Sequence, residues 1–194
     1  MARVPTIDPA AFPSELAAVL GDPGSDQRVA LGALPAWAVR PDLAVAMVTF
    51  QRALDAGALL PARLRELVRL RVAFHNRCRS CMAVRSARAI ADGMTDGVVC
   101  SLERPEEADD LTDAEKAAIH YADLMATDHL AVDDTVFDRL RLSFDDGEIV
   151  ELGAHIGVCV GFGRLSATWD LVDDLPLSFR ADDAAPWSDD VIVR

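Results

Sequence analysis

The sequence predicts an all-α protein. Along several segments the apolar residues recur at three- and four-residue spacing, as they do on one side of a helix. Helix start and stop signals bound most of these segments, and no stretch alternates polar and apolar residues long enough to predict a strand. The predicted helices are, in chain order, 13–20, 42–55, 62–75, 78–92, 113–127, 133–142 and 146–170.

Local signals justify these boundaries. Pro61 stands where a first-turn proline belongs, ahead of the 62–75 helix. Thr112 with Glu115, and Asp145 with Glu148, have the spacing of a capping box, which marks the start of a helix. We expect the 62–75 and 78–92 helices to form an antiparallel hairpin, with the 146–170 helix at the centre of the bundle.

Composition divides the chain into three parts. Prolines punctuate residues 1–40, which predicts a surface segment with one short helix. Residues 41–172 carry the helical patterns and form the predicted domain. Residues 173–194 are rich in aspartate and predict an acidic surface tail.

Charge and targeting signals narrow the class of protein. Hydrophobic residues make up 51% of the chain, which excludes a disordered protein. A net charge of −13 repels phosphate backbones, so we expect no nucleic-acid partner. The N-terminus lacks an apolar signal region, and four cysteines do not make a secreted disulfide framework, so we expect a cytoplasmic protein.

The last predicted helix is apolar enough to raise the possibility of a membrane span. It also carries a GxxxGxxxG stripe that begins at Gly153. Glu151, His155 and Arg164 would make insertion costly. We therefore expect a soluble helix that packs closely through its glycines, and no membrane partner.

The stretch Cys78-Arg79-Ser80-Cys81 is the main candidate for chemistry. A CxxC can be half a zinc site, a redox pair or two ordinary small residues. The sequence has no second CxxC and no HxxxH, so we expect no metal site. A thioredoxin-like fold places its CxxC after a strand, and no strand is predicted before Cys78. At 100° per residue, a helix over 78–92 places Cys78, Cys81 and Arg85 on one side. The helix N-terminus and Arg85 would then favour a thiolate, unless Arg85 is only a solvated charge.

Several motifs resemble the AhpD-like (carboxymuconolactone decarboxylase) superfamily. They are Arg65-Glu66-Leu67, the CxxC twelve positions after Glu66, and Gly93-Met94-Thr95. Residues 111–115, 121–122 and 144–152 resemble the larger, peroxidase-related members, so the resemblance covers about residues 40–170.

This resemblance implies an all-α fold, a trimeric or hexameric homo-oligomer, and reduction of a peroxide or disulfide substrate at the expense of a dithiol reductant, without an organic cofactor. Carried to this chain, Cys81 would be the attacking thiol, Cys78 the resolving thiol, and Glu66 a proton-relay carboxylate. The decarboxylases of the family generally lack the cysteine pair. Glu66 also has a simpler interpretation, a surface ion pair with Arg69.

The sequence departs from the family pattern at two positions. Arg85 stands where the family has its motif histidine, and Ser80 replaces a second histidine of the alkylhydroperoxidase members. Arginine cannot exchange a proton near neutral pH. His155 is one candidate for the missing base and His75 the other, although His155 could equally be a core residue satisfied by Glu151.

Three functions follow as hypotheses. The first is a thiol-dependent peroxidase or disulfide oxidoreductase that uses Cys78 and Cys81. The second is a non-redox enzyme, lactone decarboxylase-like, in which the Arg85 region holds an anionic molecule. The third is an inactive oligomer that binds small anions on the same scaffold.

Overall fold

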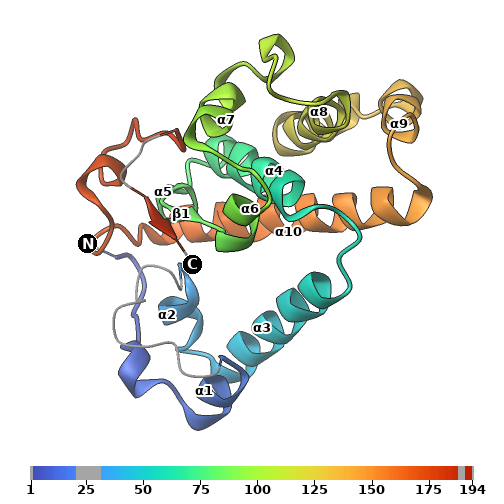
Figure 1. Cartoon of the computed structure of the whole chain (residues 1–194). Coiled ribbons are helices and arrows are strands. Elements are labelled where there is room, and N and C mark those ends of the chain that lie inside the picture. The colour runs from blue at the N-terminus through green and yellow to red at the C-terminus, as the bar shows by residue number, and fades with distance from the viewer. Residues whose placement is uncertain (1, 21–31, 188–190, 194) are drawn as a thin grey trace.

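Helix α4 (Ala62–His75) lies at the centre of the main helical group in the computed structural model, which describes residues 2–20, 32–187 and 191–193 (Figure 1). It packs most extensively against α8 (Asp113–Thr127) and α10 (Asp146–Trp169), and also against the two short helices that follow it. Its buried residues occupy several sides of the helix, because neighbours surround it: Leu64, Glu66, Leu67, Val68, Leu70, Val72 and Ala73. α4 therefore carries the first candidate residue, Glu66, into the interior.

The helices of the N-terminal part form a second group, on the other side of α10 (Figure 1). They are α1 (Ser14–Leu20), α2 (Leu34–Trp37) and α3 (Pro41–Ala56), and they share a small core around Leu16 and Ala44. The remaining helices are α5 (Arg79–Met82), α6 (Ala87–Ala91), α7 (Asp96–Cys100) and α9 (Asp134–Arg141). The 3-10 turns are Pro9–Ala11, Ser101–Glu103, Pro105–Glu107, His129–Ala131 and Leu177–Phe179.

The predicted all-α class is confirmed, and so are most predicted helix starts. Thr112 accepts a hydrogen bond from the backbone of Glu115, whose side chain accepts one in return, so α8 begins with a capping box. Asp145 and Glu148 form the same arrangement at α10. These caps satisfy N–H groups that the first turn of a helix would otherwise leave unpaired.

The helix predicted over 78–92 is wrong. The chain instead forms α5, then a two-residue strand β1 (Val84–Arg85), then α6. β1 pairs in parallel with β2 (Ile192–Val193), a contact with the far end of the chain that local periodicity cannot reveal. Ser86 then caps α6 by accepting a hydrogen bond from the backbone N–H of Ala89. Arg85 therefore lies in a different element from Cys78 and Cys81, which stand at the start of α5.

The predicted central position of the last helix is also wrong, since α4 occupies the centre. α10 buries Leu152 and Ile156 against its neighbours, but space is open beside Gly157 and Gly161. Close approach occurs instead at Gly163, where a Cβ would lie 2.5 Å from the Asn76 side-chain nitrogen. That glycine lets the C-terminal end of α4 rest directly on α10.

α10 is the helix in the described part of the chain whose length and composition would allow a membrane span, with a mean hydropathy of 1.3. Its polar residues are bonded to other elements of the fold. Glu151 accepts hydrogen bonds from the backbone of Leu59 and Leu60, and Arg164 donates to the side chain of Asn76. These contacts explain the polar residues as parts of the packed bundle.

The C-terminal segment lies against the region that carries the CxxC. Leu175, Phe179 and Ala184 are buried in a cluster with Met82 and Ala83. Residues 188–190 and 194 of this predicted tail, and residues 1 and 21–31 of the predicted N-terminal segment, lie outside the described residues. What is described of the tail packs on the helical domain.

Candidate functional site

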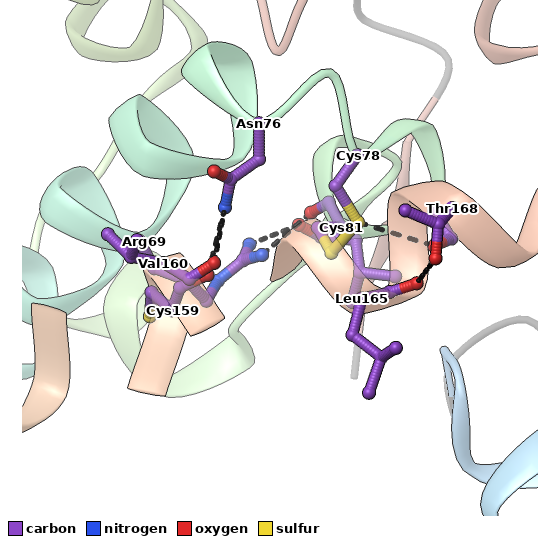
Figure 2. The surroundings of a disulfide bond; sticks show 10 residues. Arg69, Asn76, Cys78, Cys81, Cys159, Val160, Leu165 and Thr168 are labelled. Carbon is purple, nitrogen blue, oxygen red and sulfur yellow. Dashed lines mark hydrogen bonds between the residues drawn. A yellow bond between two sulfur atoms is a disulfide. The ribbon is translucent and has the colours of Figure 1, made fainter. Parts of the chain in front are cut away.

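Cys78 and Cys81 are joined in a disulfide at the start of α5, with their Cα atoms 5.2 Å apart (Figure 2). Cys78 is the N-cap residue of α5 and has no exposed surface, whereas Cys81 is partly exposed. The left-handed backbone of Arg77 (φ 52°) turns the chain out of α4 and into this position. Of the two cysteines, only Cys81 is open to a substrate.

Glu66 and Arg69 form a buried ion pair one turn apart on α4. Arg69 Nε and Nη2 each donate to a carboxylate oxygen of Glu66 at 2.7 Å, and Ser86 N–H donates to the same carboxylate at 2.9 Å. The side chain of Glu66 is 6% exposed, so the surface-pair interpretation is wrong about the location although right about the partner. Burial disfavours the charge of Arg69, but its attraction to Glu66 outweighs this and raises the pKa of Arg69.

Arg69 is also the cation beside the disulfide. Its Nη1 donates to the carbonyl of Cys81 at 2.6 Å and its Nη2 to the carbonyl of Val84 at 2.7 Å (Figure 2). The chain of contacts Glu66–Arg69–Cys81 thus links the predicted carboxylate to the predicted attacking cysteine. The i, i+3 spacing of Glu66 and Arg69 was visible in the sequence, but nothing local indicated that the pair faces inward.

The prediction that Arg85 shares one side of a helix with the two cysteines is wrong. Its guanidinium is buried and donates to the carbonyls of Met82 and Val84 and, in a short contact, to that of Pro186. Burial, with the nearby charge of Arg69, lowers the pKa of Arg85 to about 10. The solvated-charge alternative is wrong as well, because Arg85 joins the CxxC segment to the C-terminal tail.

Arg79, inside the CxxC, makes a second connection to the tail. It pairs with Asp170 in a short contact and with Asp182 at 3.1 Å, and it donates to the carbonyl of Arg180. Phe179 of the tail packs with Met82 and Ala83, and Cys81 lies against the same cluster. The tail is thus bonded to and packed on the CxxC segment.

His155 and His75, the two candidate bases, occupy different surroundings. His155 Nε2 lies 2.9 Å from the carbonyl of Arg65 and 3.9 Å from the sulfur of Cys159. A carbonyl only accepts hydrogen bonds, so Nε2 carries the hydrogen of the neutral ring. Burial lowers the pKa of His155 and keeps the ring neutral. His75 instead bonds Asp123 at 2.7 Å, between α4 and α8.

A cavity of about 580 Å³ brings the candidate residues together. Its walls come from α3, α4, α10 and the CxxC segment, and Glu66, Arg69, Cys81, His155 and Cys159 line it. Cys78, Arg85 and His75 are not among the lining residues. Within the described residues, no three His, Cys, Asp or Glu side chains gather closely enough to hold a metal ion. The cavity thus presents one sulfur of the disulfide, a buried cation and a neutral histidine.

Known proteins share both the sequence pattern and this architecture. Residues 41–124 match the carboxymuconolactone decarboxylase family, over a range that runs from α3 through the CxxC into α8. That range is 84 of the 194 residues, so the sequence similarity to the family covers less than half of the chain. Uncharacterized protein Rv2313c of Mycobacterium tuberculosis (strain H37Rv) is 39% identical over 89 residues, as is its counterpart in strain CDC 1551. That match covers 45% of this chain and 31% of the relative, so the chain spans about a third of the length of these curated relatives.

Solved structures share the fold of nearly the whole chain. The AhpD core of an uncharacterized peroxidase-related protein from Ralstonia eutropha JMP134 aligns with a TM-score of 0.74 and 19% identity, covering 92% of this chain and 94% of that one. Apo debrominase Bmp8 aligns with a TM-score of 0.73 and 21% identity, covering 93% and 95% of the two chains. Identities this low show a common fold and leave the activity to be argued from the site.

Proposed function

We propose that this protein is a thiol-dependent oxidoreductase that reduces a peroxide or disulfide with the Cys78–Cys81 pair. The observation that carries the proposal is the position of the disulfide. Cys81, one half of the disulfide, lines a cavity that a buried cation and a histidine also line. A reactive cysteine needs access to substrate and a positive environment for its thiolate, and Cys81 has both beside Arg69.

The reaction begins from the reduced pair. The Cys81 thiolate attacks the outer oxygen of a hydroperoxide, the O–O bond breaks, and the alcohol leaves with a proton while Cys81 becomes a sulfenic acid. The Cys78 thiol then attacks the Cys81 sulfur, which forms the disulfide and releases water. A dithiol reductant restores both thiols and is itself oxidised to a disulfide. With a disulfide substrate, the first step is a thiol exchange instead.

Three residues around Cys81 have distinct proposed roles in stabilising the thiolate and in transferring protons. Arg69, held by Glu66, stabilises the thiolate through its charge, the role that the sequence assigned to Arg85. Glu66 is engaged by Arg69 and by Ser86, so we propose that it positions Arg69 rather than relays protons. His155 is neutral with Nε2 as a donor, so it can accept the proton only through Nδ1.

Relatives support the proposal without deciding it. The fold neighbours include a peroxidase-related protein and debrominase Bmp8, the latter also solved as a cysteine-to-alanine variant in complex with 2,3,4-tribromopyrrole. In that complex, a protein of this fold that lacks one cysteine binds a small halogenated ring. The predicted homo-oligomer and the dithiol partner remain part of the proposal.

The experiment compares single-cysteine variants of the reduced protein after a pulse of cumene hydroperoxide or cystine, followed by mass spectrometry. Wild type should re-form the Cys78–Cys81 bond. Cys78→Ser should stop at a sulfenic acid or mixed disulfide on Cys81, and Cys81→Ser should not react. Cys100→Ser, at an exposed free cysteine, is the matched control and should behave as wild type.

Two results would contradict the proposal. Equal reaction at Cys78 and Cys81 would remove the assignment of the attacking thiol. Inert thiols in the wild-type protein would favour the alternatives, a non-redox enzyme or an inactive anion-binding protein on the same scaffold.

A further inference from the structure

The cavity beside Cys81 has an unusual charge for this chain. Its described lining contains four arginines, at positions 52, 65, 69 and 88, and two carboxylates, Asp55 and Glu66. The whole chain carries a net charge of −13, so a cavity with excess positive charge runs against the general trend of the surface. Such local excess concentrates anions even on an acidic protein.

The pairing of these residues locates the excess. Glu66 is bound to Arg69, and Asp55 pairs with Arg65 at 2.7 Å. Each carboxylate is thus already balanced by one arginine. The unbalanced positive charge falls on Arg52 and Arg88, both of which have exposed side chains.

Arg65 lies deepest among the arginines not bound to Glu66, with 13% of its side chain exposed. Its partner Asp55 is 57% exposed, so that bond is open to competition from water and from another carboxylate. Asp55 accepts from Nη1 of Arg65. A guanidinium has five N–H donors, so Arg65 retains the capacity to bind an additional anion through its terminal nitrogens.

Part of the cavity lining is apolar. Trp37 and Phe162 meet edge to face, with ring centroids 5.6 Å apart, and both line the cavity. Aliphatic side chains of α3 and α10 extend this wall: Met47, Val48, Leu54 and Val158. A volume of about 580 Å³ lies within the range of organic ligand sites. Hydrogen peroxide needs little more room than a water molecule, about 30 Å³.

We propose that this cavity binds an apolar organic anion, an aromatic or branched body that carries one carboxylate. Arg65 holds the carboxylate, with Arg88 and Arg52 attracting it, and the Trp37–Phe162 wall holds the apolar body. The binding site stands by itself, whereas the identification of this anion as the substrate of Cys81 rests on the proposed function.

Binding is tested by calorimetry on the full chain, with 2-naphthoate as the probe and the uncharged 2-naphthamide as its matched analogue. We expect the carboxylate to bind at least about tenfold more tightly than the amide. Arg65→Gln should abolish that difference. Arg88→Gln should reduce it, and this side chain is exposed. Arg104→Gln, at an exposed arginine outside the cavity, is the control and should preserve it.

Equal affinity of the wild-type protein for the two probes would overturn the proposal. It would also be overturned if Arg104→Gln reduced the difference in affinity as much as Arg65→Gln does. If Arg65→Gln proves unfolded by circular dichroism, the Arg88→Gln result decides, because that variant leaves every buried contact intact.

Turnover separates this inference from the proposed function. The hydroperoxide of 4-isopropylbenzoate, which has an aromatic body and one carboxylate, should be reduced with a higher kcat/KM than that of its methyl ester, and Arg65→Gln should remove the preference. If the protein binds 2-naphthoate but does not reduce peroxides, the anion-binding site is supported and the peroxidase activity is contradicted. If it reduces the acid and its ester equally well and does not bind 2-naphthoate, the peroxidase activity is supported and the anion-binding site is contradicted.

Discussion

The substitution Glu66→Gln tests whether the buried ion pair on α4 holds the site together. Glu66 accepts two hydrogen bonds from Arg69 and one from Ser86, and its side chain is 6% exposed against 14% for that of Arg69. The substituted glutamine would keep the shape and one acceptor oxygen but would leave the Arg69 charge buried without a counter-charge. Removing one member of a buried pair typically costs 3–5 kcal/mol, and the remaining acceptor places this variant near the lower end, about 3 kcal/mol.

The assay is thermal unfolding of the oxidised protein, followed by circular dichroism. For a domain of this size, about 3 kcal/mol corresponds to a fall in melting temperature of about 6–12 °C. The chain offers a matched control, Glu107→Gln, because Arg104 and Glu107 form an exposed pair with the same i, i+3 spacing. That change should cost less than about 0.5 kcal/mol.

The double variant Glu66→Gln with Arg69→Met completes the cycle. Because it removes the unpaired charge as well, it should be more stable than Glu66→Gln alone. A Glu66→Gln variant as stable as the Glu107→Gln control would refute the reasoning, since it would mean that water reaches the pair. A double variant less stable than the single one would refute it too.

Three further predictions concern neighbouring features. Burial lowers the pKa of His155, so the unfolded chain takes up a proton before the folded chain as pH falls. Wild type should therefore lose stability below about pH 6.5, and His155→Gln should lack that part of the loss. A pH dependence identical in the two proteins would contradict this. Arg85→Met removes the bond to Pro186, and hydrogen exchange should become faster at the paired strands β1 and β2; unchanged exchange would show that the tail is held without Arg85. Cys159 lines the cavity and Cys100 does not, so bound 2-naphthoate should slow alkylation of Cys159 alone; equal slowing at both cysteines would place the ligand elsewhere.

Local signals predicted the fold well wherever the structure depends on local contacts. The capping boxes at Thr112 and Asp145 specify helix starts through hydrogen bonds within four residues, so the sequence alone was sufficient. The helix prediction for the segment after Cys81 was wrong because the structure of that segment depends on a distant contact. Its extended form at Val84 depends on Ile192, more than 100 positions away, and a periodic pattern carries no information about such a partner.

The site shows the same division. Cys81, Glu66 and His155 were predicted from motif and spacing, and the structure brings them to one cavity. Arg69 was missed as a functional residue because an i, i+3 pair looks the same in sequence whether it faces solvent or core. Only the packing of α4 among α5, α6, α8 and α10 distinguishes the two.

The transfer of the cationic role from Arg85 to Arg69 has a consequence for the reactivity of Cys81. Arg69 contacts both Glu66 and the Cys81 backbone, so the carboxylate offsets part of the positive potential that a Cys81 thiolate would experience. Glu66→Gln should therefore lower the pKa of the reduced Cys81 thiol even as it destabilises the fold, whereas Arg69→Met should raise it.

The pH dependence of iodoacetamide alkylation of Cys81, in a Cys100→Ser and Cys159→Ser background, measures both shifts. A carboxylate that served mainly as a proton relay would give a different result, because its loss would slow peroxide turnover without lowering the thiol pKa. Stability and reactivity that move in opposite directions in Glu66→Gln would identify the carboxylate as a group that stabilises the fold at the expense of thiolate formation.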